Sequence, residues 1–168
     1  WNAHNLLTYS EDFSNAAWVK TTTTITANAG VAPDGTTTAD QISHTSTTAN
    51  LAQAYTGVSG ATYTAAIFAK SVDHRWFRLV GDIGSVWFDL QNGVVGSSQA
   101  GLTGEITAFP DGWYLCAVAW VATDTSVPIN PLLADADGSF TESSGTSAYI
   151  WGAHLYRSDL GGMADVPL

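Results

Sequence analysis

Cysteine is almost absent from this sequence, and its scarcity excludes two ways of holding a domain together. Cys116 is the one cysteine among 168 residues, so an internal disulfide and a cysteine-based zinc cluster are both excluded. Cys116 lies in an apolar stretch from Trp113 to Val121, where a buried small hydrophobic side chain is the expected role. We therefore expect the domain to depend on its core, or on a bound ion.

Charged residues are also scarce, at 12% of the chain, which is about half the usual share for a soluble domain. Five Lys and Arg face fifteen Asp and Glu, for a net charge of -10. Because an acidic surface repels phosphates, we expect no nucleic-acid binding and no docking on anionic membranes. An uncharged, hydroxyl-rich surface is typical of virion and extracellular β-proteins, so we expect one of those locations.

Long hydrophobic runs and helical periodicity are missing as well. No run of about 18 apolar residues is present, which argues against membrane insertion through a helix. Thr, Val, Ile and aromatic residues alternate instead, with Gly, Asn and Asp interrupting them about every 8–12 residues. This pattern predicts an all-β fold, a two-sheet antiparallel β-sandwich of about eight to ten strands with jelly-roll connections. We assign residues 1–157 to this sandwich and residues 158–168, which lack a strand pattern, to a C-terminal arm or linker.

Alternation within the predicted strands indicates which side chains enter the core, because successive residues of a strand point to opposite faces. The strand at 112–122 is apolar on both faces and therefore central, with its bulkier face inward. Three further strands are assigned in the same way. The residues expected in the core are Tyr114, Cys116, Val118 and Trp120, then Phe77 and Leu79, then Val86, Phe88 and Leu90. The last strand is predicted to carry Tyr149, Trp151, Ala153 and Leu155 on one face.

Several tryptophans are predicted to point away from that core. Trp76 and Trp87 alternate with core residues, and Trp113 stands at a strand start in a similar position. Exposed aromatic rings stack on the C–H faces of sugars. The alternative is that each ring packs against a loop or a neighbouring subunit.

The few basic residues cluster near these tryptophans, since Lys70, Arg75 and Arg78 fall within nine positions. Arginine donates paired hydrogen bonds to hydroxyls and carboxylates. The alternative is that Lys70 and Arg75 flank a solvated hairpin and that Arg78 pairs with Asp89. The candidate glycan-binding residues are Lys70, Arg75, Trp76, Arg78, Trp87, Asp89 and Trp113.

Motifs for catalysis are missing from the sequence. There is no Gly-x-Ser-x-Gly, and the four histidines include no His-Glu-x-x-His pair. We therefore predict that the chain is not an enzyme. A lyase-like jelly roll remains an alternative, because carboxylates such as Asp73, Asp82 and Glu105 are present.

The opening residues and several later motifs resemble carbohydrate-binding-module-like jelly-roll domains. Such domains occur in bacteriophage tail and head-fibre proteins and beside polysaccharide-degrading enzymes. The resemblance covers roughly residues 5 to 156, and its motifs are Asn5–Phe13, Ala17-Trp18, Ala32–Asp40, Phe88–Gly93, Asp111–Tyr114, Leu133–Gly138 and Tyr149–Ala153.

The resemblance implies a sandwich whose sheet or loop rim holds a glycan, and a structural Ca²⁺ between the opening segment and the last strand. By position, it implies a metal site at Glu11, Asp12 and His154. Imidazole is a poor calcium ligand, so a backbone oxygen would have to serve at His154. The acidic loop at Asp135, Asp137 and Glu142 is a second place where oxygen ligands gather.

Two functions follow from this reading. The first is a non-catalytic glycan-binding domain of a phage fibre or structural protein that recognises cell-surface polysaccharide. The second is a purely structural virion module for decoration or assembly without a glycan ligand, whose aromatic residues are buried at contacts of a homo-oligomer.

Overall fold

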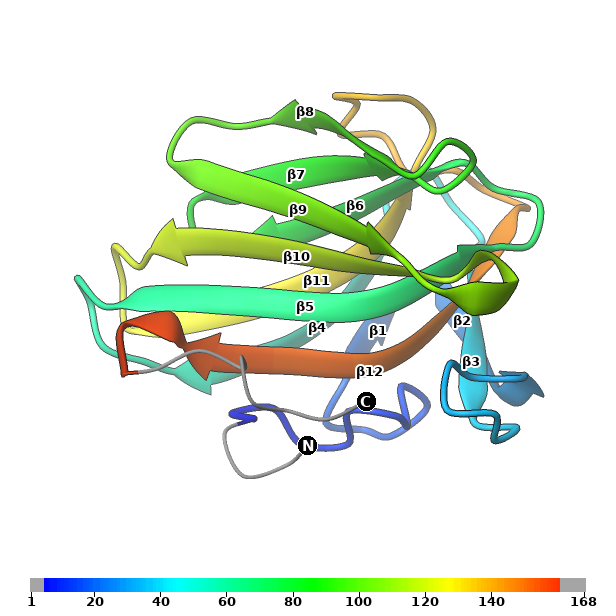
Figure 1. The fold of residues 1–168 in the computed structure, drawn as a ribbon, viewed down its shortest axis with the longest axis horizontal. Coiled ribbons are helices and arrows are strands. Elements are labelled where there is room, and N and C mark those ends of the chain that lie inside the picture. The colour runs from blue at the N-terminus through cyan, green and yellow to red at the C-terminus, as the bar shows by residue number, and fades with distance from the viewer. Residues whose placement is uncertain (1–4, 161–168) are drawn as a thin grey trace.

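The computed structural model describes residues 5–160, which form two antiparallel sheets of six strands each. The sheets pack face to face, so the predicted β-sandwich is confirmed, with twelve strands in the described residues rather than eight to ten (Figure 1). The front sheet contains, in spatial order, β2 (Thr23–Gly30), β3 (Ala39–His44), β12 (Ser147–Arg157), β5 (Thr62–Ser71), β10 (Tyr114–Val121) and β9 (Leu102–Ala108). The back sheet contains β1 (Val19–Thr21), β4 (Asn50–Thr56), β11 (Ser126–Ala134), β6 (Trp76–Gly81), β7 (Gly84–Asp89) and β8 (Val94–Ser98).

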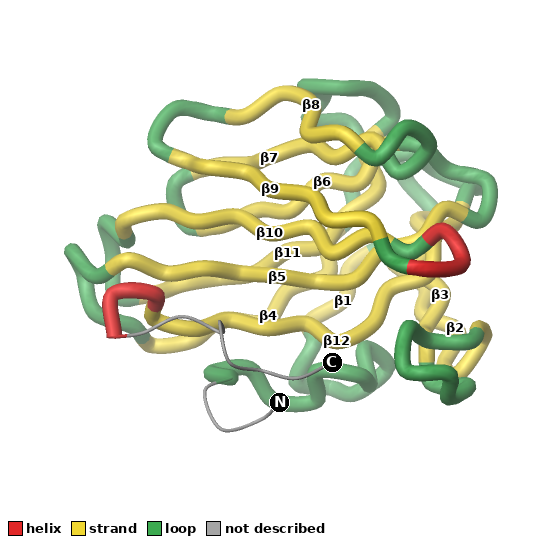
Figure 2. Tube along the Cα trace, in the orientation of Figure 1, coloured by secondary structure: helices red, strands yellow, loops and turns green. Residues whose placement is uncertain are grey.

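The chain changes sheet repeatedly, as a jelly roll requires. It crosses between sheets after β1, β3, β4, β5, β8, β10 and β11. Helical structure in the described residues is limited to the short turns η2 (Pro110–Gly112) and η3 (Ser158–Leu160), drawn red in Figure 2. Among residues 5–160, no helix has the length and apolar character needed to cross a membrane.

The core between the sheets contains the side chains that alternation assigned to it. Phe77, Val86, Phe88 and Cys116 are fully buried in one cluster that joins both sheets. Burial raises the pKa of the Cys116 thiol well above its ordinary value, because a thiolate is poorly solvated there. Cys116 is therefore an unreactive core residue.

The last strand departs from the predicted alternation. Ile150, Ala153 and Leu155 enter the core, whereas Trp151 pairs with Phe68 on the outer face of β5. The register shifts between Trp151 and His154, at a bulge where Gly152 has a φ of 63°. A bulge inserts one extra residue and reverses the alternation beyond it. The prediction that Tyr149, Trp151, Ala153 and Leu155 share one face is therefore wrong, and Tyr156 points outward.

The predicted C-terminal arm begins inside the described residues. Ser158–Leu160 forms η3 directly after β12, and the rest of the arm, 161–168, lies outside the described residues. The boundary between the sandwich and the arm stays a prediction.

Candidate functional site

The part of the back sheet's outer face around Arg78 and Trp87, where glycan contact was predicted, is covered by the loop at residues 135–146. Trp87 is paired with Arg78 on this face, as alternation predicted. However, the Trp87 side chain is 1% exposed and its Nε1 donates to the Ser139 carbonyl at 2.8 Å. Its ring also meets Phe140 edge-on, with 5.2 Å between centroids. The alternative that the tryptophan packs against a loop holds for Trp87.

Arg78 is held under the same loop by a buried ion pair. Its guanidinium donates to a Glu142 carboxylate oxygen, and the two residues are 7% and 4% exposed. Glu142 is bridged to Ala134 at the end of β11, which pairs with β6 and so brings this carboxylate to Arg78. The alternative that Arg78 pairs with Asp89 is therefore wrong.

Asp89 pairs with Arg75 instead, and it also closes the turn after β7. Its carboxylate accepts two hydrogen bonds from Arg75, at 3.0 and 2.7 Å, and one from each of the backbone amides of Gln91 and Asn92. The Arg75 guanidinium holds the pKa of Asp89 well below its usual range. Asp89, at 1% exposed, is thus an internal partner and not a ligand contact.

The remaining predicted residues do not form one surface. Trp113 is 1% exposed, in a second apolar cluster on the outer face of the front sheet, where its Nε1 donates to Val31. Lys70 lies on β5 of the front sheet, whereas Trp76 lies on β6 of the back sheet. Arg75 stays exposed and borders a hollow of about 320 Å³ with Ser71, Asp73, His74 and Gln91. Arg78, Trp87, Asp89 and Trp113 are thus buried by internal partners and do not form the exposed surface that the sequence predicted. Which residues contact a glycan stays a prediction.

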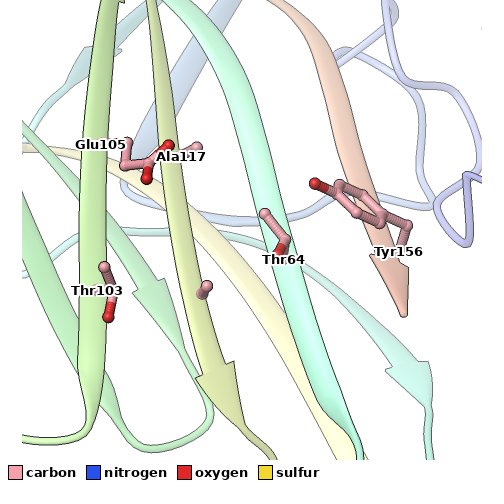
Figure 3. A pocket seen from close by; sticks show the side chains of 6 residues that line it. Thr64, Thr103, Glu105, Ala117 and Tyr156 are labelled. Atoms are coloured by element: carbon pink, nitrogen blue, oxygen red, sulfur yellow. The ribbon is translucent and has the colours of Figure 1, made fainter. Parts of the chain in front are cut away.

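An open groove lies on the outer face of the front sheet, over β9, β10, β5 and β12 (Figure 3). It has a volume of about 190 Å³. The strand register places its residues in two neighbouring rows across the sheet. One row is Glu105, Ala117, Ala66 and His154, and the other is Thr103, Ala119, Thr64 and Tyr156.

The shape of this groove follows from side-chain size. Ala66, Ala117 and Ala119 form a low floor on the two central strands. Thr103 and Glu105 rise from β9 on one side, and Tyr156 rises from β12 on the other with its ring directed toward β5 (Figure 3). The bulge at Gly152 is what turns Tyr156 to this face. The groove therefore combines one aromatic ring with hydroxyls and a single carboxylate.

Sequence reasoning missed this groove, although it contained a signal for it. The strand predicted at 112–122 is apolar on both faces, with the less bulky face outward. Alternating small residues on the outward face of a central strand indicate a depression when neighbouring strands carry larger side chains. Those neighbours are set by strand register, which the sequence alone did not supply.

The implied calcium site has no assembled set of side-chain ligands in the described chain. The opening segment does run beside the last strand, through backbone hydrogen bonds from Leu6 to Leu155 and from Ala153 to Ser10. However, Asp12 accepts hydrogen bonds from Ser14 and Asn15, and His154 points to the groove face. Among residues 5–160, no three His, Cys, Asp or Glu side chains lie close enough to hold a metal ion. Calcium binding stays a prediction.

A lysine ammonium fills the oxygen-rich centre of this opening segment. Lys20 Nζ donates to the carbonyls of Phe13, Ser14, Asn15 and Trp18, at 2.8–3.1 Å. Backbone carbonyls around a cation are also what a calcium site offers. The residues present therefore fit an ammonium group at this position, and the carbonyls it occupies are not free for a metal ion.

Replacing Lys20 with methionine is expected to destabilise the domain by about 1–3 kcal/mol, because four carbonyls lose a charged donor. Thermal unfolding followed by circular dichroism measures the effect, with Lys70→Met as the matched control. Chelation with EDTA is expected to leave the wild-type midpoint unchanged. A midpoint that falls on chelation would show that a metal ion, and not Lys20, organises this segment.

Comparisons with known proteins find structures of similar fold, but no match to a family model or a curated sequence. The chain superimposes on tailspike protein 4 of bacteriophage CBA120, in its enzymatically active domain, with a TM-score of 0.55 and 14% identity over 91% of this chain and 21% of that one.

Two further structures come from bacteria. A Clostridium thermocellum endo-1,4-beta-D-xylanase fragment of CBM22-1 and GH10 modules, complexed with xylohexaose, gives a TM-score of 0.54 at 15% identity over 98% of this chain and 30% of that one. A candidate sugar-binding protein from Bacteroides thetaiotaomicron gives 0.51 at 14% identity, with 92% and 95% covered. The chain thus spans less than a third of the first two proteins. It has the fold of a carbohydrate-binding-module-like jelly roll.

Proposed function

We propose that this chain is a non-catalytic glycan-binding domain whose binding site is the groove on the front sheet. The observation that carries the proposal is the pair of rows across β9, β10, β5 and β12, with a floor of small side chains between Tyr156 and Glu105. The likeness to carbohydrate-binding folds agrees with this assignment and does not identify a ligand.

The groove offers the contacts that a sugar ring uses. The Tyr156 ring presents an aromatic face to C–H groups, and its hydroxyl can exchange hydrogen bonds with the sugar. Thr64, Thr103 and Glu105 supply further polar atoms along the groove. Because Glu105 is the one charged residue among the groove-lining side chains of the described chain, 5–160, a neutral or amino-sugar glycan fits better than a uronate or sulfated one.

The side chains of the groove argue against glycoside hydrolysis there. Glycoside hydrolysis ordinarily requires two carboxylates, one on either side of the scissile bond. Among the described residues that line this groove, the only carboxylate is that of Glu105. A groove with one carboxylate and an aromatic wall suits binding without bond cleavage.

We place the domain outside the cell or on a virion, within a phage fibre or structural protein. The support is its low charge content, its hydroxyl-rich strands and the motif resemblance described above. The alternative, a structural virion module without a glycan, predicts assembly into a homo-oligomer. Light scattering over a range of concentrations separates the two, since a concentration-independent monomer contradicts the assembly role.

A glycan array, probed with and without EDTA, tests the proposal. We expect binding to neutral glycans, weaker or absent binding to uronate and sulfated glycans, and no effect of chelation. Loss of binding in the presence of EDTA would show that a metal ion such as calcium is needed for glycan binding. No binding to any glycan, by a domain shown to be folded, would contradict the proposed function.

A further inference from the structure

We propose that the groove receives the end of a glycan chain and not its interior, an inference that rests on the proposed function. It comes from the shape of the outer face of the front sheet beyond the two groove rows. The groove runs parallel to the central strands β5 and β10, because the small residues of these strands form its floor.

One end of the groove is closed by large side chains. The row next to Ala66 and Ala117 contains Phe68 and Leu115, which are paired across β5 and β10, and Trp151 is paired with Phe68 from β12. Phe109 packs edge-on against Phe68, with 5.0 Å between ring centroids. The floor thus rises from alanine side chains to aromatic rings packed edge-on and tilted against one another within one row.

This wall is fixed in place by the segment that leads from β2 into the start of β3. Ala32 and Ala39 pack against Phe68, Trp113 and Trp151 in the same apolar cluster. The Trp151 Nε1 donates to the Thr38 hydroxyl at 3.0 Å, and the Trp113 Nε1 donates to the Val31 carbonyl at 3.2 Å. Phe68 is fully buried as a result. A glycan chain lying in the groove therefore cannot continue over this part of the sheet.

Among the described residues, no aromatic wall stands at the opposite end. The next row beyond Thr64 and Ala119 holds Thr62 and Val121, and Val121 is 52% exposed. Val121 is the fourth residue after Ala117 along β10, which corresponds to about 13 Å of strand. The groove is thus a short slot, open at one end, that suits the last few sugar units of a chain.

Binding to intact and partly hydrolysed polysaccharides tests this inference. The probes are xylan, mannan, β-glucan and galactan, each compared at equal mass in the two forms, with bound protein measured by calorimetry. If the groove takes chain ends, the number of binding sites per gram rises by the same factor as the number of ends. As a control, monosaccharides are added to the wild-type protein as competitors. They should displace the hydrolysed polysaccharides from the groove.

The outcomes separate this inference from the proposed function. If the intact and the hydrolysed polysaccharide offer equal numbers of binding sites per gram, the recognition of chain ends is overturned. The proposed glycan binding is not contradicted by that result. Absence of binding to every probe, in either form, would overturn both. Lowering the wall with Phe109→Ala and Leu115→Ala is expected to bring binding of the intact polymers closer to that of the hydrolysed ones.

Discussion

Replacing Glu142 with alanine is expected to lower the free energy of unfolding by about 3–5 kcal/mol, because it leaves a buried charge without its partner. Arg78 is 7% exposed, lies under the loop at 135–146 and has Glu142 as its carboxylate partner. The variant also removes the acceptor for the Ala49 amide, which donates to the second Glu142 oxygen at 3.3 Å. Urea denaturation of the two proteins measures the difference.

Two further variants show whether the buried charge is the cause. Asp159→Asn breaks the surface pair between Arg157 and Asp159, and should change stability little because solvent screens exposed pairs. The double variant Arg78→Met with Glu142→Leu should recover most of the loss, since well-packed apolar groups often replace a buried ion pair without penalty. A Glu142→Ala protein as stable as the Asp159→Asn protein would contradict the account.

Filling the floor of the groove should strongly weaken glycan binding without disturbing the core. Ala117 is half-buried and faces outward between Ala66 and Glu105. A leucine there would occupy the space assigned to the sugar, so we expect affinity to fall at least about tenfold, which corresponds to about 1.4 kcal/mol. Tyr156→Ala removes the aromatic ring at the side of the groove and should weaken binding similarly, because the sugar loses its stacking partner. Calorimetry with a glycan selected on the array measures both effects.

The matched control for this prediction is Ala54→Leu. Ala54 is exposed on β4 of the back sheet, away from the groove, so the same increase in volume should leave affinity unchanged. All three variants should keep the wild-type unfolding midpoint within a few degrees. If Ala117→Leu binds glycan as well as Ala54→Leu does, the groove is not the site.

The alternation of side chains along the strands was sufficient to predict the fold. It was not sufficient to predict whether the outward-facing side chains are exposed. It correctly directed Phe77 and Phe88 into the core and Trp87 away from it. What lies over Trp87, however, is Ser139 and Phe140, more than 50 positions later in the chain. No local pattern indicates that a distant loop will cover a sheet face, so the predicted glycan surface could not be tested from the sequence.

The groove depends on two further features that are invisible to a period-two pattern. The bulge at Gly152 shifts the register of β12 and brings Tyr156 to the outer face. The pairing of Ala117 with both Ala66 and Glu105 then decides which side chains border the floor. Glycine in a strand suggests a bulge, but partner strands and their register follow only from the assembled sandwich.

The most direct test of glycan binding in the front-sheet groove is an amide chemical-shift titration of the isotope-labelled domain with an array-selected neutral oligosaccharide. The account predicts that the largest shifts occur at the groove residues Thr64, Thr103, Glu105, Ala117, Ala119 and Tyr156. Shifts concentrated instead at Arg75 and Trp76, with the groove amides unmoved, would contradict it and return the site to the surface first predicted from the sequence.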